Sequence, residues 1–196
     1  MPIVLNGSTG VITGIPVGGL PDGIVDTDML ANNAVTSAKA TGIGGGKILQ
    51  VVRGTQATNY TQQSTTYADL NLSATITPQT NSKVLAFLDI QVQKSGVNYH
   101  GGFGVKLVRT PSGGSATAVY TSPTSTEIYD YHGSAGGEVF DREKFPWNLY
   151  DSSPSGNGST AITYKVQVST YTSSGGATMS FHHSGTSSIT LIEVSA

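Results

Sequence analysis

The sequence predicts an all-β protein, with an antiparallel β-sandwich or jelly-roll-like knob preceded by an extended N-terminal arm. Two observations predict the sandwich: apolar and polar residues alternate over several segments after residue 47, and short turn clusters separate these segments. Alternation of this kind is typical of strands that bury one face. Strands that recur with short turns are typical of sandwiches and jelly rolls. A third observation, the different composition of the first 46 residues, predicts the arm.

The arm, residues 1–46, contains no aromatic residue, because the 1 Trp, 9 Tyr and 5 Phe of the chain all lie from Tyr60 onward. Such a segment cannot close a core alone, since folding must offset roughly 1–2 kcal/mol of backbone entropy per residue. It nevertheless carries too many aliphatic side chains to remain in water. We therefore expect the arm to become ordered on another protein. The expected anchoring residues are Val4, Leu5, Val11, Ile12, Ile15, Val17, Leu20, Met29 and Leu30.

Two local features are expected near the end of the arm. Asp26 is a good N-cap residue, so a short helical turn is predicted to follow it. A glycine-rich run then predicts a hinge, because glycine adopts positive φ without steric cost. We place the domain boundary at this hinge, which leaves residues 47–196 as the knob. The hinge glycines are Gly42, Gly44, Gly45 and Gly46.

Strands of the knob are predicted wherever every second residue is apolar. Clusters of turn-forming residues lie between them, at 79–82, 111–114 and 173–176. The alternating segments are Leu70–Ile76, Val84–Val92, Phe103–Leu107 and Ile162–Val168. Two strands are apolar on both faces, the second of these segments and the C-terminal strand. A strand of this type is buried on both faces. In a two-layer sandwich the core covers only the inner face of such a strand, so a neighbouring subunit must cover the outer face. We therefore expect a homo-oligomer. The expected interface residues are Leu85, Phe87, Ile192 and Val194.

Composition excludes several classes of partner. The formal net charge is -2 and the pI is about 6.0, so the chain lacks the basic stripe of a nucleic-acid-binding protein. No apolar run approaches the ~18 residues of a membrane span, so membrane insertion is not expected. The chain has no cysteine, which excludes disulfides and thiolate chemistry and is consistent with synthesis in a reducing cytoplasm.

The segment 126–151 is the most aromatic and polar part of the chain and contains its one tryptophan. One interpretation is a ligand loop, because contact surfaces favour aromatic residues among polar groups. The other is a long insertion whose aromatic side chains pack on the knob or on the next subunit. The candidate contact residues are Tyr129, Tyr131, His132, Trp147 and Tyr150.

The sequence offers only weak evidence for a metal site or a catalytic site. His182 and His183 are adjacent, and neighbouring residues on a strand point to opposite faces, so one site takes only one of them easily, with His100 or His132 as a further ligand. The pair Glu138 and Asp141 resembles a glycosidase pair, but the knob is small for a depolymerase. We therefore expect no metal site, no cofactor and no enzymatic activity.

Short motifs at both ends resemble virion surface proteins of tailed phages, including phages of aquatic bacteria. In the arm these motifs are Gly19–Gly23, Asp26–Leu30 and Ala34–Lys39. In the knob they are Lys47–Val52, Asn81–Leu85, Thr163–Val168 and Ser188–Val194.

The resemblance implies a jelly-roll-like fold, a homotrimer, and attachment to major capsid or other virion proteins through the N-terminus. It also implies synthesis in the bacterial host cytoplasm and a final location on the virion surface. The sequence contains no repetitive shaft between arm and knob, which favours a capsid cement or decoration protein. The alternative is a short tail fibre or tail-tip protein whose 126–151 segment contacts a glycan or protein on the host surface.

Overall fold

The computed structural model describes residues 4–6, 11–13, 47–96, 100–131, 139–172 and 178–195. The chain divides into two units, Met1–Gly44 and Gly45–Ala196. In the first unit, β1 (Val4–Asn6) and β2 (Val11–Thr13) pair antiparallel. The other predicted anchors, the helical turn after Asp26 and the four hinge glycines lie outside the described residues. Among the described residues, no helix is long and apolar enough to cross a membrane.

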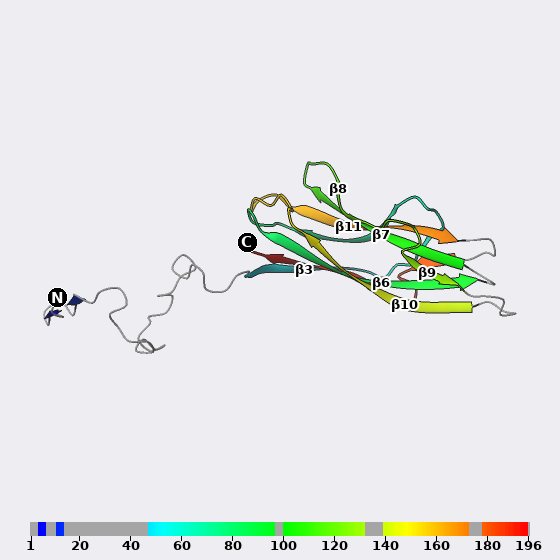
Figure 1. Ribbon diagram of the computed structural model, residues 1–196, viewed down its shortest axis with the longest axis horizontal. Helices are drawn as coiled ribbons and strands as arrows, with labels where there is room; N and C mark the ends of the chain where they lie inside the picture. Colours follow the sequence, from blue (N-terminus) through cyan, green and yellow to red (C-terminus); the bar gives the residue numbers. More distant parts are fainter. Residues whose placement is uncertain are drawn as a thin grey trace. The chain divides into compact units, whose positions relative to one another are not determined.

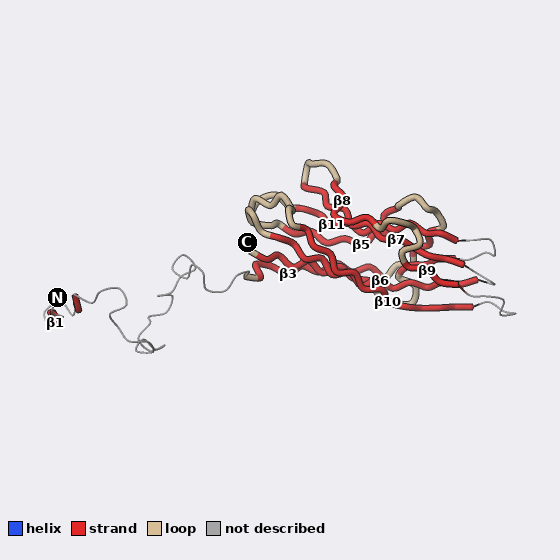
Figure 2. Tube along the Cα trace, in the orientation of Figure 1, coloured by secondary structure: helices blue, strands red, loops and turns tan. Residues whose placement is uncertain are grey.

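The knob contains two antiparallel sheets that face each other, as predicted (Figure 1). The six-stranded sheet has the order β3 (Ile48–Gln56), β13 (Ser187–Val194), β6 (Lys83–Gly96), β12 (Thr178–Phe181) and β4 (Tyr60–Gln62), and β10 (Val139–Asp151) also pairs with β6. The five-stranded sheet has the order β5 (Ala68–Ile76), β11 (Ile162–Thr172), β7 (His100–Pro111) and β8 (Thr117–Thr121), and β9 (Ile128–Tyr131) also pairs with β7. The described part of the knob is strand and loop throughout (Figure 2).

The core lies between the sheets and is formed by the predicted alternating positions. On β5, Leu70, Leu72 and Ile76 are fully or almost fully buried, and the same pattern continues on β6, β7 and β11. Burial of a side chain of this size contributes roughly 1.5–3 kcal/mol. Phe103 stands at the centre of an aromatic group, with its ring edge-on to that of Phe145 at 5.2 Å between centroids. The all-β sandwich prediction is therefore confirmed.

One side of the sandwich is closed by a close approach between β3 and β5. A Cβ atom on Gly54 would overlap the carbonyl oxygen of Ser73. The side chain of Gln56 extends across the same gap and donates a hydrogen bond to the carbonyl oxygen of Asn71 at 3.2 Å. Glycine is therefore required at position 54, because two backbones approach each other there.

Strand β10 forms the opposite edge of the six-stranded sheet. It pairs with β6 along its whole length, from Val139 opposite Gly96 to Asp151 opposite Val84. Its middle contains Pro146, which has no N–H to offer a further strand, and the exposed Lys144. Proline and lysine on an edge strand oppose pairing with another chain. The edge of β10 is therefore a poor contact site, and contacts with other chains are expected on the faces of the sheets.

Candidate assembly face

An apolar row crosses the outer face of the six-stranded sheet. Backbone pairing places Ile192 of β13 beside Val51 of β3 on one side and Leu85 of β6 on the other. Leu85 in turn lies opposite Tyr150 of β10. The two ends of the row are the most open, since Val51 and Tyr150 are each 58% exposed. Four strands therefore present one continuous apolar line to the outside.

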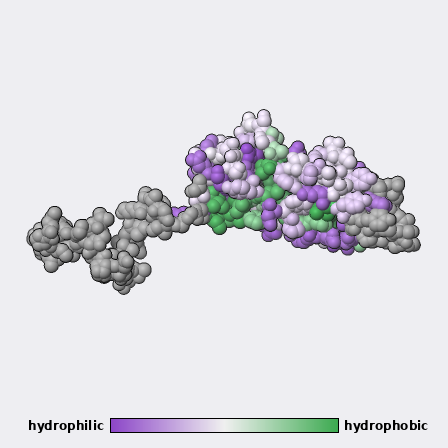
Figure 3. Space-filling view, in the orientation of Figure 1, coloured by the Kyte–Doolittle hydropathy of each residue, from purple (hydrophilic) through white to green (hydrophobic). Residues whose placement is uncertain are grey.

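Further apolar side chains flank this row. Phe87 lies one step along β6, between Thr190 and Asn148, and is 39% exposed. On the other side of the row, Ile48 pairs with Val194 and is 64% exposed. We call the whole set the assembly face; it consists of Ile48, Val51, Leu85, Phe87, Tyr150, Ile192 and Val194. Figure 3 shows hydrophobic atoms gathered over the part of the knob that contains β3.

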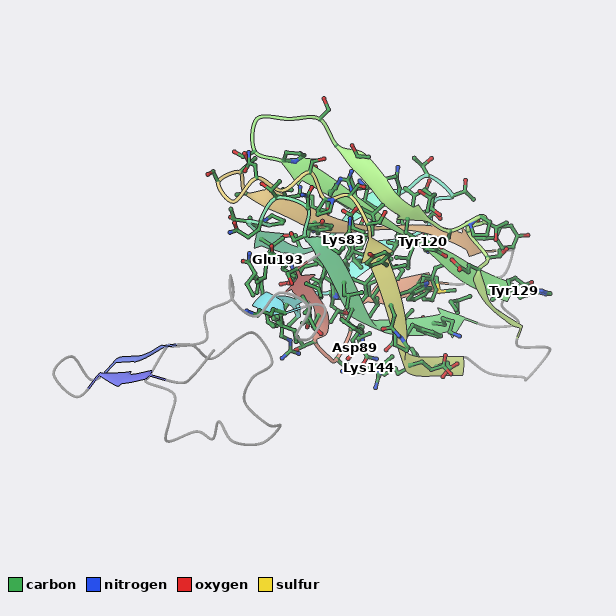
Figure 4. The ribbon with its side chains drawn as sticks, turned by 60° about the vertical axis from the view of Figure 1, so that its left-hand side comes forward. Lys83, Asp89, Tyr120, Tyr129, Lys144 and Glu193 are labelled. Carbon is green, nitrogen blue, oxygen red and sulfur yellow. The ribbon has the colours of Figure 1, made fainter. Side chains whose placement is uncertain are left out.

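Most of the remainder of the same outer face is polar. Asp89 and Lys144, on the neighbouring strands β6 and β10, form an exposed ion pair at 3.0 Å (Figure 4). Farther along the same strands, the Arg142 Nε donates a hydrogen bond to Gln93 Oε1 at 2.6 Å. The continuous apolar row therefore lies in the half of the sheet where β3 begins and β13 ends, and Phe140 of β10, which is 58% exposed, is a separate apolar side chain toward the other end.

The outer face of the five-stranded sheet has a different character. Thr75 and Thr163 join their hydroxyl groups at 2.9 Å across β5 and β11. Lys165 and Asp69 form an exposed ion pair at 3.1 Å on the same strands. Since hydroxyls and paired charges remain well hydrated, this face is suited to solvent. The two outer faces of the sandwich thus differ, and only one presents an extended apolar surface among the described residues.

A buried carboxylate fixes the backbone beneath the assembly face. Glu193 points inward from β13 and is fully buried. It accepts one hydrogen bond from the Gln50 Nε2 of β3 and another from the backbone N–H of Gln79 at 2.6 Å. Buried carboxylates need such donors because their desolvation is costly. The edge strand β3 is therefore held against β13, which keeps Val51 and Ile192 side by side.

The first and last described residues of the knob are also joined. The backbone N–H of Lys47 donates to the Ser195 hydroxyl at 2.9 Å, and the backbone N–H of Ser195 donates to the Lys47 carbonyl at 2.9 Å. This pair fixes the start of β3 against the end of β13. Ile48, the next residue along the chain, already belongs to the assembly face.

The prediction of a loop at 126–151 is wrong, because the segment contains β9 and β10, and its aromatic residues do not share one surface. Trp147 points inward and meets Phe103 at 5.7 Å between ring centroids, whereas Tyr150 belongs to the assembly face. Tyr129 lies on β9, is 49% exposed, and bonds through its hydroxyl to His100 Nδ1 at 3.2 Å. The side chain of Tyr131, together with His132, lies outside the described residues.

The histidine pair has one buried and one outer member. His182 is buried; its Nε2 lies 3.0 Å from the Leu70 carbonyl, and its Nδ1 lies 2.7 Å from the Ser187 hydroxyl. Burial lowers the pKa of His182, against the opposing effect of the hydrogen bond to Leu70. His183 contacts the hydroxyl of Ser184 instead. In the described part of the chain, no three His, Asp or Glu residues are grouped as metal ligands would be.

Sequence reasoning missed part of the assembly face. The four predicted interface residues, Leu85, Phe87, Ile192 and Val194, lie together on it. Ile48 and Val51 were not predicted, and Tyr150 was assigned to a ligand loop. A signal for β3 was available, because the run from Ile48 to Val52 is apolar on both faces of a strand, as is the C-terminal strand.

No family model and no curated protein matches the chain. Among solved structures, that of infectious bursal disease virus Gx strain is 15% identical, with a TM-score of 0.39 over 76% of this chain and 36% of that chain. The Gt strain structure is 13% identical, with a TM-score of 0.39 over 75% and 38%. A mutant VP2 protein of the same virus, in derived T=1 particles, is 14% identical, with a TM-score of 0.36 over 74% and 36%. The chain thus spans little more than a third of the viral chains it resembles, and the resemblance is one of fold alone.

Proposed function

We propose that this chain is a non-enzymatic structural protein of a tailed-phage virion that assembles as a homotrimer. Its knobs associate through the assembly face, and its arms attach to major capsid or other virion proteins. The observation that carries this proposal is the row Val51–Ile192–Leu85–Tyr150, a continuous apolar line across four strands. Contiguous exposed apolar patches on a soluble protein are typical of contact sites.

A second copy of the chain is the partner that best fits this face. The edge strand beside it is protected by Pro146 and Lys144, so a partner must approach the face of the sheet. Two cations flank the row on the same face, Arg53 beside Thr190 and Lys83 beside Val194, and the Lys83 Nζ donates a hydrogen bond to the Ser152 carbonyl at 2.6 Å. An equally apolar surface is supplied by the same face of other copies, and in a trimer three such faces meet around the threefold axis instead of pairing two by two. Three knobs joined in this way also present three arms, which raises the avidity for particles.

Light scattering of the full chain tests the oligomer. We expect the wild-type chain to be trimeric and Leu85→Asp to be monomeric, because a carboxylate in the middle of the apolar row would be buried without a partner. The matched control is Thr117→Asp, which places the same charge on an exposed position of β8 in the other sheet. A monomeric wild type, or a Leu85→Asp chain that remains trimeric, would refute the assembly face.

Within the virion we propose the role of capsid cement, with the knobs facing outward on the virion surface. Cement would act by burying apolar area across boundaries between capsid subunits, at roughly 25 cal/mol per Å² before association costs. The copy number measured on a stained gel of purified particles tests this role. Cement requires hundreds of copies per particle, and a dozen copies would contradict it.

The second candidate is a short tail fibre or tail-tip protein that contacts the host surface. It is favoured by Tyr129, whose half-exposed ring is held by the hydrogen bond to His100. A fixed, exposed tyrosine is a common anchor in contact surfaces. A low copy number, together with loss of adsorption to host cells in Tyr129→Ala particles, would select this function over cement.

A further inference from the structure

A groove of about 550 Å³ lies on the outer face of the five-stranded sheet, on the opposite sheet from the assembly face. Its floor consists of β5, β11 and β7, and the connection between β7 and β8 forms one wall. This connection stands out from the rest of the knob (Figure 1). The residues that line the groove include Asp69, Val108, Pro111, Ala116, Lys165 and Gln167.

Polar groups with balanced charge form the floor. Lys165 Nζ and Asp69 Oδ2 lie 3.1 Å apart, and their side chains are 48% and 38% exposed. Gln167 lies opposite Asp69 in the strand pairing, so its amide is on the same face. Because the ion pair is neutral as a unit, the floor offers several hydrogen-bond donors and acceptors without attracting a net charge. Asp69 would repel an anionic ligand, and Lys165 would repel a cationic one.

The wall of the groove is held in place and presents two apolar side chains, Pro111 and Ala116, beside Ser112 and two glycines. The nearly buried Val108 adjoins it on the floor. The turn is closed by a hydrogen bond from the Gly114 N–H to the Pro111 carbonyl at 2.9 Å. A second bond runs from the Ser112 N–H to the Ala161 carbonyl at 2.8 Å and fixes the turn to the start of β11. The groove is therefore formed before any ligand arrives.

We propose that this groove binds a neutral oligosaccharide. A sugar carries hydroxyl groups that suit the Asp69, Lys165 and Gln167 side chains, and C–H surfaces that suit Pro111 and Ala116. The volume lies within the ~300–1,000 Å³ that small-molecule sites span. An extended peptide would instead need an open strand edge, and within the floor β5 is paired to β11 and β11 to β7, so no open edge lies between the floor strands. The site lies on the other sheet from the assembly face, so it does not rest on the proposed virion function.

The experiment applies the full-length chain to an array of neutral hexose and deoxyhexose oligosaccharides, with uronate- and sialate-containing ones beside them. Two variants remove hydrogen-bonding groups with little change of shape: Lys165→Met and Gln167→Leu. Ala116→Arg, in the exposed turn, obstructs the groove without touching the floor. Asn148→Leu, on the outer face of the other sheet, is the matched control for added apolar surface.

We expect binding to a subset of the neutral sugars, weakened at least about tenfold by each groove variant and unchanged in Asn148→Leu. Thermal melting of each variant shows whether it is folded. If Lys165→Met or Gln167→Leu does not fold, the binding measured with Ala116→Arg tests the proposal. Binding of acidic sugars alone, absence of binding to every neutral sugar, or binding that survives Ala116→Arg would overturn the proposal. Light scattering of the same variants keeps the two proposals separate, because a groove variant is expected to retain the oligomeric state of the wild type.

Discussion

Asp151 of β10 accepts a hydrogen bond from the Tyr164 hydroxyl of β11 at 2.8 Å, and so joins the two sheets inside the core. Arg109 of β7 forms an ion pair with the same carboxylate. Both Asp151 and Tyr164 are buried, and burial raises the pKa of Tyr164, followed by the effect of the neighbouring Asp151 charge. The tyrosine is therefore a donor across the whole range in which the protein is handled.

Removing the Asp151–Tyr164 hydrogen bond is expected to destabilise the knob, and the loss of stability depends on which of the two side chains is replaced. Tyr164→Phe should lower the free energy of unfolding by about 1.5–3 kcal/mol, because a hydrogen bond to a buried carboxylate is lost. Asp151→Ala should cost about 3–5 kcal/mol, because Arg109 is left without its carboxylate in a largely buried position. Urea unfolding measures both values, and equal losses in the two variants would contradict this assignment.

The buried His182 is expected to make stability depend on pH. Its pKa in the folded state is lowered, so below the ordinary value of about 6.5 the unfolded chain binds more protons than the folded one. The free energy of unfolding should therefore fall as the pH drops from about 6.5 toward the lower folded pKa. In His182→Gln this part of the slope should disappear, whereas His183→Gln should retain it. Identical slopes in the two variants would show that another group is responsible.

Gly54 is expected to tolerate no side chain. Gly54→Ala should lower the free energy of unfolding by more than 2 kcal/mol, because its Cβ would overlap the Ser73 carbonyl and force β3 away from β5; losses of roughly this size are typical of overpacking. Thr55→Ala, at the exposed neighbouring position, should stay within about 0.5 kcal/mol of the wild type. Thermal and urea unfolding of the two variants compare them directly, and a small loss in both would argue against the close approach.

Deletion of residues 1–40 is expected to separate assembly from attachment. The shortened chain retains the whole knob, so it should fold and remain trimeric in light scattering. It should no longer co-sediment with particles that lack the protein, because the proposed anchors are gone. Co-sedimentation of the shortened chain would place the attachment site on the knob.

Local sequence patterns predicted five strands of the knob, β5, β6, β7, β11 and β13, and most of its core, whereas β9 and β10 fell in a segment that was assigned to a loop. The alternation from Leu70 to Ile76 was sufficient to predict one buried face, because each side chain on a strand points opposite to the next. It also indicated that Leu85 and Ile192 lie on the outer face of their strands. These conclusions need only the local geometry of a strand, which every short segment carries in its own pattern.

Which residues lie side by side depends on the pairing of strands that are distant in the chain. Val51, Leu85, Tyr150 and Ile192 come from four strands that are far apart in the chain, and their alignment depends on the pairing register. Trp147 and Tyr150 looked equivalent in sequence, yet they face opposite sides of β10 because their positions differ by an odd number of residues. The saccharide groove likewise arises from the connection between β7 and β8 beside the paired Asp69 and Lys165. Long-range pairing creates such surfaces, and no local pattern encodes it.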